Sequence, residues 1–250
     1  MRVAIVTGGA KGIGSAIAAR LAQDGLAVAV LDVNADAARA RAETLIQAGF
    51  VAGGYGADVG SEESMRQAFN AVVADLGLPT VLVNNAGFLR NKLFKKLRLD
   101  EWEQSLRVNA TGTFIASRLI EPFVREVQWG RIVNIASTAV VGYFGAAHYS
   151  AAKSAVVGLT KSLALELGPI GVTVNAIAPG FVATDMTRQI AADASLDFDQ
   201  MRAQQISQVA VRRLGEPEDI ANAVSFFVSP NAGFVSGQLL YVAGGPVGLG

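Results

Sequence analysis

Short apolar segments alternate with longer amphipathic segments along the whole chain. The short segments are mostly runs of Val, Ile, Leu and Ala without polar alternation, a pattern typical of strands covered on both faces. They predict strands at residues 3–7, 27–32, 54–58, 80–84, 131–136, 172–177 and 239–242. Between them, apolar residues recur every three or four positions and predict helices at residues 13–24, 35–49, 61–77, 108–125, 149–167 and 218–228. This alternation indicates an α/β fold with a doubly wound parallel sheet and helices on both faces.

The length agrees with one such unit. The chain has 250 residues, of which 51% are hydrophobic, and α/β folds often reach this size as a single domain. We therefore expect one domain over residues 1–250. Residues 184–209 are the least regular part of the sequence, and we expect them to form a mobile substrate-binding segment with short helices.

Composition removes several classes of function. Lys plus Arg and Asp plus Glu each number 21, and no basic run stands out, so nucleic-acid binding is not expected. No apolar stretch approaches the roughly 20 residues that span a bilayer, and the N-terminal run is too short for a signal peptide, so we expect a soluble cytoplasmic protein. The absence of Cys and the single His148 exclude disulfides, Cys nucleophiles and Cys/His zinc sites, and we expect no metal.

A glycine-rich turn follows the first predicted strand. The segment "TGGAKGIG", residues 7–14, places Gly8, Gly12 and Gly14 between a strand and a helix. Glycines allow a tight turn and close approach of a ligand, and the following helix directs free N–H groups and its positive dipole end at that turn. This arrangement predicts a site for the pyrophosphate of a dinucleotide, although the glycine spacing differs from G-x-G-x-x-G. The alternative is an ordinary flexible turn.

Two charged residues bear on the choice of dinucleotide. Asp32 closes the second strand about 20 residues after the glycines, where an acid accepts hydrogen bonds from ribose hydroxyls and repels a 2′-phosphate. Lys11 lies inside the loop and could meet a 2′-phosphate. We give Asp32 more weight, because a carboxylate facing a dianionic phosphate is a direct penalty, and we predict NAD(H) over NADP(H). The alternatives are a solvated lysine and a turn aspartate.

A phenol and an ammonium group stand together at the start of one predicted helix. In "HYSAAKSAVVGLTKSLALEL", Tyr149 and Lys153 are four residues apart and share a helix face. A phenol with a pKa near 10 is only about 0.1% ionised at pH 7, and a nearby cation favours the phenolate. The pair therefore indicates proton transfer at a carbonyl or alcohol. Taken alone, an aromatic residue packed on the core beside a solvated lysine would explain it as well.

Several motifs in order resemble one known family. "TGGAKGIG", "NNAG" at residues 84–87, Asn109, Ser137, Tyr149-x-x-x-Lys153 and "PG" at residues 179–180 occur as they do in short-chain dehydrogenases/reductases. The resemblance covers essentially the whole chain. It implies a single Rossmann-type domain with a seven-stranded parallel sheet, a nicotinamide cofactor and a homotetramer.

The resemblance also implies roles for individual residues. Tyr149 matches the catalytic acid/base, Lys153 the partner that lowers its pKa and binds the nicotinamide ribose, and Ser137 the residue that holds the substrate oxygen. Asn109 matches a helix residue that helps carry a water chain towards Lys153. The structural alternatives are a turn cap at Ser137 and a polar helix surface at Asn109. His148 is more simply a structural residue or part of the pocket rim.

The family pattern implies a set of cofactor contacts. Asp58 and Val59 match the adenine contact, residues 85–87 the ribose side and Thr184 the carboxamide contact. The full set is Gly8, Lys11, Gly12, Ile13, Gly14, Asp32, Asp58, Val59, Asn85, Ala86, Gly87, Tyr149, Lys153, Pro179, Gly180, Val182 and Thr184.

The substrate is less constrained by the sequence. Residues 87–114 and "GRIVNIAS" resemble 3-oxoacyl-carrier-protein reductases, but Asp32 and Ile170 depart from their usual pattern. We therefore expect an NAD(H)-dependent oxidoreductase of secondary alcohols and ketones. The alternatives are a 3-oxoacyl thioester reductase acting on a carrier protein or coenzyme A, and a non-catalytic NAD-binding regulatory protein.

Candidate residues for the substrate walls and for carrier docking follow from the same segments. Residues 139–144 and 184–209 should form the pocket walls, and their apolar members suggest a medium-sized apolar or aromatic ketone; these members are Tyr143, Phe144, Met186 and Ile190. An acidic carrier or coenzyme A could instead be attracted by Arg125, Lys92, Lys95 and Lys96, which a solvated surface explains equally well.

Overall fold

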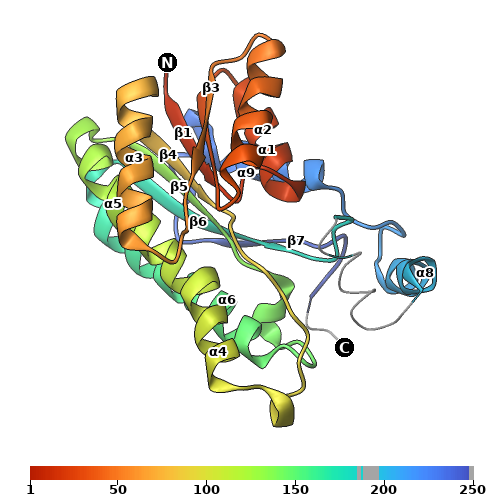
Figure 1. Cartoon of the computed structure of the whole chain (residues 1–250). Helices are drawn as coiled ribbons and strands as arrows, with labels where there is room; N and C mark the ends of the chain where they lie inside the picture. Colours follow the sequence, from red (N-terminus) through yellow and green to blue (C-terminus); the bar gives the residue numbers. More distant parts are fainter. Residues whose placement is uncertain (185–186, 188–196, 248–250) are drawn as a thin grey trace.

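The computed structural model describes residues 1–184, 187 and 197–247, so Met186 and Ile190 lie outside the described part. Seven parallel strands form one sheet in the order β3-β2-β1-β4-β5-β6-β7 (Figure 1). Their bounds are β1 (Val3–Thr7), β2 (Ala27–Asp32), β3 (Ala52–Gly56), β4 (Pro79–Asn84), β5 (Gly130–Ile135), β6 (Val172–Pro179) and β7 (Leu239–Val242). The fold class predicted from the sequence is confirmed: the chain forms an α/β domain with a doubly wound sheet.

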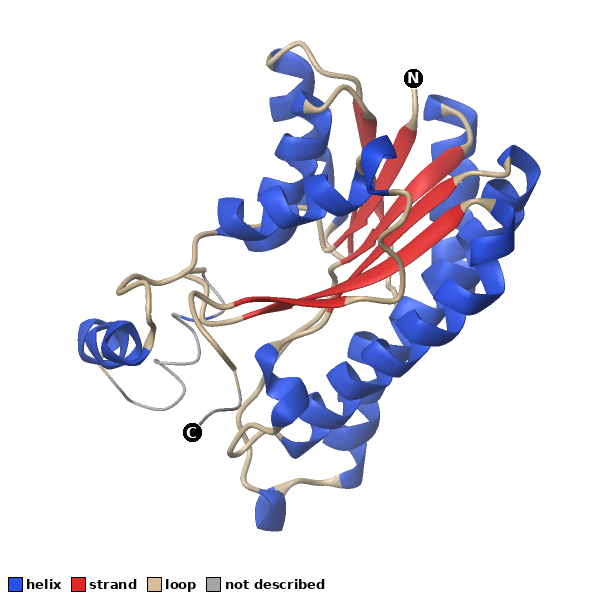
Figure 2. Ribbon diagram, turned by 180° about the vertical axis from the view of Figure 1, so that it is seen from behind, coloured by secondary structure: helices blue, strands red, loops and turns tan. Residues whose placement is uncertain are grey.

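Helices cover both faces of the sheet (Figure 2). One face packs against α1 (Gly12–Gln23), α2 (Ala35–Gln47) and α9 (Pro217–Val228) through a core that includes Ile17, Leu45 and Phe227. The other packs against α3 (Glu62–Leu76), α5 (Gly112–Val127) and α6 (Ala147–Leu167) through a core that includes Phe69, Ile120 and Leu167. Because strands β1, β2, β4, β5 and β6 are buried on both sides, their apolar runs need no polar alternation.

Helix α4 (Leu99–Leu106) and α8 (Phe198–Gln208) complete the set of α-helices in the described chain. The sequence predicted one helix at 108–125. The structure instead has α4, then a π-helical turn at Arg107–Thr111, and then α5, which begins at Gly112. Short 3-10 turns occupy Phe94–Lys96, Thr138–Val141, Gly168–Ile170 and Pro230–Ala232. None of the helices in the described chain is long and apolar enough to cross a membrane.

The strand order reverses inside the sheet, between β1 and β4. From β1 the chain moves outward through β2 and β3, and then returns to place β4 on the other side of β1. The chain passes from β1 to α1 on one face of the sheet and from β4 towards α5 on the other face, and ligands of open α/β sheets bind in the crevice at such a switch point. The glycine-rich turn follows β1, and the "NNAG" segment follows β4, so both lie at this crevice.

Candidate active site

The glycine-rich turn has a backbone that few other residues could adopt. Gly8 and Gly12 have φ angles of 60° and 52°, in the left-handed region that favours glycine. A Cβ atom on Gly14 would lie 2.1 Å from the Gly8 carbonyl oxygen, so the start of α1 rests directly on the turn. The three glycines selected from the sequence are therefore each required by the geometry.

The N-terminus of α1 is suited to an anionic ligand. Lys11 is its N-cap residue and makes no side-chain capping hydrogen bond, whereas Asn34 caps α2 and Ser61 caps α3. An uncapped helix start leaves backbone N–H groups available, and the helix dipole favours negative charge there. The glycine cradle and these free donors fit the pyrophosphate of a dinucleotide.

Side chains bridge the two loops at the crevice. The Thr7 hydroxyl oxygen accepts hydrogen bonds from the backbone N–H groups of Asn85 and Ala86, both at 3.1 Å. Asn85 Nδ2 donates to the carbonyl oxygens of Thr7 and Gly8, at 3.0 and 2.9 Å. The predicted residues Asn85 and Ala86 are thus brought against the glycine-rich turn. Thr7, which the sequence analysis did not single out as a site residue, is the acceptor that joins them.

Asp32 lies beside the same turn. Its carboxylate accepts hydrogen bonds from the backbone N–H groups of Ala10, at 3.3 Å, and Asn34, at 3.1 Å. These bonds hold the carboxylate between the end of β2 and the glycine-rich turn. Lys11 is exposed and forms no ion pair within the part of the chain that the structure describes. The acid is therefore fixed in place, while the neighbouring lysine is not.

Asp58 and Val59 lie at the carboxyl side of β3. Asp58 accepts from the Arg107 guanidinium at 2.9 Å and from the Gly60 N–H at 2.9 Å. The hydrogen bond from Arg107 is the main cause that holds the pKa of Asp58 below its usual range. Val59 packs against the start of α5, where a Cβ atom on Gly112 would lie 2.9 Å away. The sequence did not indicate that Arg107 would form an ion pair with Asp58.

The "PG" segment connects the end of β6 to the glycine-rich turn. The Gly180 N–H donates to Val242 O at 3.0 Å, and a Cβ on Gly180 would lie 2.9 Å from Ala243, which leaves no room for a side chain. Val182 forms an isolated parallel bridge with Gly215. Thr184 reaches the glycine-rich turn, because its Cγ2 would lie 3.5 Å from a Cβ placed on Gly12. The segment that follows β6 therefore lies along the crevice, and it includes Pro179, Gly180, Val182 and Thr184.

Ser137 and Tyr149 meet beyond the carboxyl end of β5. Ser137 lies two residues beyond the end of β5, and Tyr149 lies in the first turn of α6. The Ser137 hydroxyl lies close enough to the phenol of Tyr149 to lower its pKa. Ser137 Oγ also accepts from the Ala139 N–H at 3.1 Å, so the serine caps a 3-10 turn as well as contacting the tyrosine. The two interpretations of Ser137, as a cap and as a site residue, are both compatible with this geometry.

Lys153 and Asn109 converge on Gly87. A Cβ on Gly87 would lie 2.5 Å from Asn109 Oδ1 and 3.4 Å from Lys153 Nζ. Both side chains are buried, so the interpretations of Lys153 as solvated and of Asn109 as an exposed helix residue are wrong. Lys153 Nζ donates to Ile135 O at 2.7 Å, and Asn109 exchanges hydrogen bonds with the backbone of Phe88, both at 3.1 Å. Asn109 lies in the π-helical turn, a feature that often occurs at functional sites.

The protonation of this pair differs from the sequence-based expectation. Burial lowers the pKa of Lys153 to about 8. Burial also raises the pKa of Tyr149, and its hydrogen bond with Ser137 is the opposing influence. Lys153 Nζ lies 5.7 Å from the Tyr149 ring centroid and is directed at Ile135 O. In the protein alone, therefore, Ser137 rather than Lys153 is the group that favours the phenolate.

His148 is buried next to Tyr149 in the sequence, and burial lowers its pKa. Neighbouring residues of a helix do not share a face, which agrees with a structural role.

The structure thus brings the predicted catalytic residues together at the carboxyl ends of the strands and adds contacts that the sequence did not reveal. These additional contacts are the Thr7 hydroxyl, the Ile135 carbonyl and Arg107.

A parallel sheet with a glycine-rich turn at its switch point and a Tyr149–Lys153 pair at the start of helix α6 is typical of a dinucleotide-dependent oxidoreductase. A family model described as "Enoyl-(Acyl carrier protein) reductase" matches residues 8–246. The chain belongs to the short-chain dehydrogenase/reductase family, whose members are oxidoreductases acting on carbonyl and hydroxyl groups with a nicotinamide cofactor.

Individual relatives are similar over nearly the full length. The short-chain reductase protein NovJ of Streptomyces niveus is 42% identical, with 97% of this chain and 93% of the relative covered. A 3-oxoacyl-[acyl-carrier-protein] reductase of Aquifex aeolicus is 40% identical, with 98% and 96% covered. The crystal structure of an actinorhodin polyketide ketoreductase with NADPH superposes with a TM-score of 0.94 at 37% identity, covering 98% of this chain and 96% of that one.

Proposed function

We propose that this protein interconverts a ketone and a secondary alcohol, with Tyr149 as the acid/base. The observation that carries the proposal is the arrangement of Ser137 beside the Tyr149 phenol beyond the carboxyl end of β5, with buried Lys153 one helical turn away. In reduction, the phenol would donate its proton to the carbonyl oxygen while the Ser137 hydroxyl hydrogen-bonds that oxygen. In oxidation, the phenolate would take the alcohol proton. The bound nicotinamide would supply or accept the hydride.

Lys153 and Asn109 have supporting roles in this proposal. The hydrogen bond to Ile135 O fixes the Lys153 ammonium group beneath the site. Asn109 Oδ1 and Lys153 Nζ both lie close to Gly87. We propose that Lys153 binds the nicotinamide ribose and that, with cofactor bound, its charge and that of the oxidised ring offset the effect of burial on Tyr149. Asn109 and Lys153 are close enough to Gly87 for a water to connect them, which supports the expected proton path.

Tyr149→Phe tests the proposed reaction. Removal of the phenol should lower kcat by at least about a hundredfold, since general acid–base catalysis contributes factors of this size. NADH absorbance with a panel of ketones measures the loss. Tyr55→Phe is the matched control, because the Tyr55 hydroxyl on β3 hydrogen-bonds Asp75 near the end of α3 and takes no part in the proposed site. Equal turnover by wild type and Tyr149→Phe would contradict the proposal. Tight NADH binding without turnover on the panel would favour a non-catalytic NAD-binding protein.

For the cofactor, we propose a preference for NAD(H). The support is the position of Asp32, whose carboxylate is held by Ala10 and Asn34 where the adenosine ribose of a dinucleotide would lie. A 2′-phosphate there would face a fixed negative charge. The likeness to a ketoreductase crystallised with NADPH, together with Lys11 in the loop, makes NADPH the alternative. Asp32→Ala should raise the ratio of kcat/KM for NADPH to that for NADH by about tenfold or more, and an unchanged ratio would contradict the role given to Asp32.

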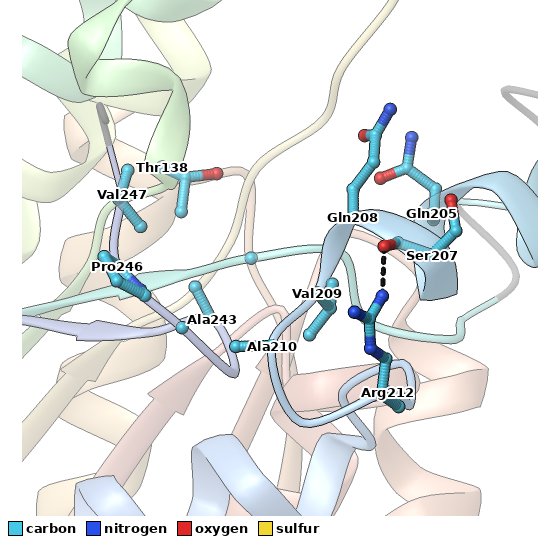
Figure 3. A pocket seen from close by; sticks show the side chains of 12 residues that line it. Thr138, Gln205, Ser207, Gln208, Val209, Ala210, Arg212, Ala243, Pro246 and Val247 are labelled. Carbon is cyan, nitrogen blue, oxygen red and sulfur yellow. Dashed lines mark hydrogen bonds between the residues drawn. The ribbon is translucent and has the colours of Figure 1, made fainter. Parts of the chain in front are cut away.

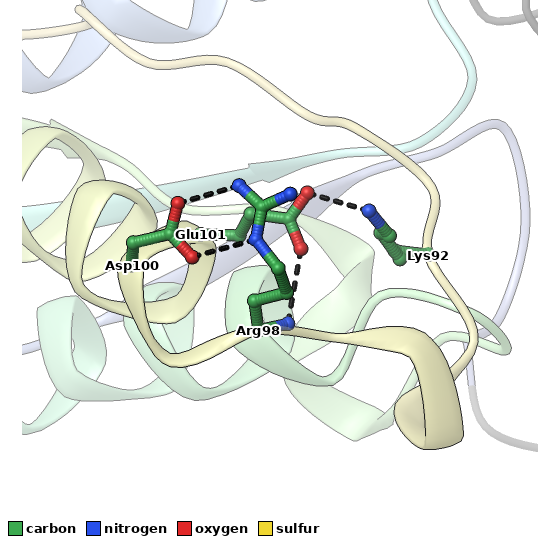
Figure 4. Close-up of polar contacts among 4 residues, drawn as sticks. All are labelled: Lys92, Arg98, Asp100 and Glu101. Atoms are coloured by element: carbon green, nitrogen blue, oxygen red, sulfur yellow. Dashed lines mark hydrogen bonds and ion pairs between the residues drawn. The ribbon is translucent and has the colours of Figure 1, made fainter.

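A 3-oxoacyl thioester is the second candidate substrate, supported by the likeness to a 3-oxoacyl-[acyl-carrier-protein] reductase. Two of the four basic residues expected to attract a carrier, Lys92 and Arg125, are paired within the chain. Lys92 forms an ion pair with Glu101 at 2.6 Å, as Figure 4 shows, and Arg125 pairs with Glu121 at 2.6 Å. Arg98 pairs with Asp100 in the same cluster. This pairing weakens the case for carrier docking through these residues. A simple ketone turned over faster than its 3-oxoacyl thioester analogue would favour the first candidate.

A further inference from the structure

A pocket lies between Thr138, the residue after Ser137, and the turn that follows α8 (Figure 3). Its volume is about 340 Å³, and its lining includes Thr138, which follows Ser137, and Gly180 of the "PG" segment. Further along, the lining comes from the end of α8, from the turn that follows it and from the C-terminal segment 243–247. The pocket therefore borders the segment that follows Ser137 and reaches residues that no catalytic role requires.

The far wall of this pocket is held in place by close packing. The Val211 N–H donates to Gly244 O at 3.0 Å. A Cβ on Gly244 would lie 2.6 Å from Val209, and one on Gly245 would lie 3.0 Å from Ala210. The turn after α8 and the C-terminal segment thus fit together without space for larger side chains. A group on this wall would be presented in a fixed position.

The charge on that wall is unbalanced. Among the described residues that line the pocket, Arg212 is the only charged one, and the others nearest to it are polar or small, such as Gln205 and Gln208. The neighbouring Arg213 is neutralised by Asp219 through two contacts, at 2.6 and 2.8 Å. Arg212 has no carboxylate partner in the part of the chain that the structure describes. A guanidinium without an acid beside it favours an anionic ligand.

The backbone of Arg212 is also exceptional. Its φ of 56° lies in the left-handed region, which only Gln128 shares among the described non-glycine residues. Such a conformation is unfavourable for a residue with a side chain and often marks a functional site. The guanidinium donates one hydrogen bond to Ser207 O near the end of α8. This cap of α8 uses one of the five N–H donors of the Arg212 guanidinium. It does not explain why the other donors lie along a pocket.

We propose that Arg212 binds an anionic group of the substrate, a carboxylate or a phosphate, at the end of the pocket remote from the reacting carbonyl. The proposal deepens the proposed ketone–alcohol chemistry and rests on it. It replaces the expectation of a purely apolar substrate with one that carries a negative charge. A carboxylate would belong to a keto acid, whereas a phosphate would belong to a pantetheine-type thioester such as coenzyme A.

The test compares charged and uncharged forms of the same substrates. Straight-chain keto acids from acetoacetate upward are compared with their methyl esters, and acetoacetyl-coenzyme A with the corresponding N-acetylcysteamine thioester. Arg212→Gly and Arg212→Asn remove the charge with residues that tolerate a positive φ, so both should fold. Arg202→Gln is the matched control, because Arg202 is exposed on α8, the helix that precedes Arg212, and does not line the pocket.

Wild type should have the lower KM for one charged series, and both Arg212 variants should raise that KM by about tenfold or more, as expected for loss of a charged hydrogen bond. The KM for the uncharged partner and kcat should change less than about twofold, and Arg212→Lys should recover part of the loss. Which series responds distinguishes carboxylate from phosphate. A change in melting temperature without this selective effect would identify Arg212 as a helix cap only and overturn the proposal.

Binding is measured separately from turnover. In the presence of NADH, Tyr149→Phe should be stabilised against heat more by the charged member of a pair than by the neutral one, and adding Arg212→Gly should abolish the difference. Equal stabilisation by both members would overturn the proposed anion site whatever the turnover results. Turnover of neutral and charged ketones alike, unaffected at Arg212, would leave the ketone–alcohol reaction standing and reject the anion site. Selective binding with no turnover would reject the reaction alone.

Discussion

Lys153 illustrates how a single buried charge couples the site to the stability of the protein. Burial lowers its pKa from 10.5 to about 8. Below pH 8 both the folded and unfolded forms carry the proton, and the folded form bears the cost of burying the charge. Between about pH 8 and 10.5, only the unfolded lysine stays protonated, so the unfolded chain binds more protons and stability increases with pH. The contribution of this residue to stability therefore rises over that window.

We predict that wild type gains stability relative to Lys153→Met as the pH is raised from 7 to 10. The gain should be about 2–3 kcal/mol, the size that a shift of this magnitude implies when most of the window is crossed. Urea unfolding of both proteins at several pH values measures the difference, and subtraction removes the other titrating groups. A difference that stays constant, or that falls with pH, would contradict the lowered pKa of Lys153.

Gly14 sets the contact between the glycine-rich turn and α1. A methyl group there would lie 2.1 Å from Gly8 O and 2.5 Å from Asn85 Nδ2, so Gly14→Ala must displace the turn. We predict at least about a tenfold weaker affinity for NADH, because the displaced backbone can no longer present its N–H groups to the pyrophosphate. A fluorescence titration measures it.

Gly158 provides the control for that substitution. It lies inside α6, and a methyl group there would have nothing within 4 Å, so Gly158→Ala should leave NADH affinity unchanged. The same change should stabilise the helix by about 0.5–1 kcal/mol, since alanine is the better helix former. Similar NADH affinities for Gly14→Ala and wild type would show that the turn does not bind the cofactor as proposed.

At the scale of elements, a buried chain of polar side chains connects the strands below the site to the helices that carry it. Asn84 Nδ2 on β4 donates to Asn134 Oδ1 on β5 at 2.8 Å and to Ser117 on α5 at 3.2 Å. Asn134 Nδ2 donates to the Thr160 hydroxyl on α6 at 2.9 Å. The network fixes α6, and therefore Tyr149 and Lys153, relative to the sheet.

We predict that Asn134→Leu lowers the free energy of unfolding by about 2–4 kcal/mol. The substitution removes two buried hydrogen bonds and leaves their partners on Asn84 and Thr160 without an equivalent, and each such loss costs about 1–3 kcal/mol. Urea unfolding measures the effect. Asn231→Ala, at an exposed 3-10 turn, should change stability by less than about 0.5 kcal/mol. A comparable stability for Asn134→Leu and wild type would show that the network is not structurally important.

Local pattern predicted the elements well where one signal dominated. The bounds of β1, β2 and β7 agree with those expected, because each is a short apolar run with a clear boundary. Strand β3 is displaced by two residues, since "AGGYG" offers little apolar pattern and pairing with β2 determines its bounds. Helix α4 was missed because Arg98 is not a typical N-cap residue; the Glu101 carboxylate instead accepts from the Arg98 N–H at 3.0 Å.

The candidate site shows the same division between local and distant information. The glycines, Asp32 and the Tyr149–Lys153 spacing could be selected because their chemistry is local to a turn or a helix. The partner of Lys153 is the backbone carbonyl of Ile135, 18 residues away, and a carbonyl has no residue-type signature. Similarly, Arg107 reaches Asp58 across 49 residues. Contacts of this kind depend on the folded arrangement of strands and could not be read from the pattern.

At the scale of the whole molecule, apolar side chains remain exposed on helices that cover one face of the sheet. Leu165 on α6 is 81% exposed and Phe114 on α5 is 46% exposed. Both helices pack against the sheet through their inner residues, so these two side chains lie on the outward parts of the helices. Exposed apolar groups on neighbouring helices of one layer are a common sign of contact with another protein copy.

We predict that these residues lie in a contact between copies of the chain and that the assembly is the tetramer expected from the family. A twofold contact would bury Leu165 and Phe114 twice, so a lysine at either position would place two like charges in an apolar interface. Leu165→Lys should shift the mass measured by light scattering from that of a tetramer towards that of a dimer. Ile46→Lys on α2, on the opposite face of the sheet, should leave the mass unchanged. A monomeric wild type would contradict the tetramer. A Leu165→Lys variant that remains tetrameric would contradict the contact, because an apolar interface at Leu165 would not tolerate the added charges.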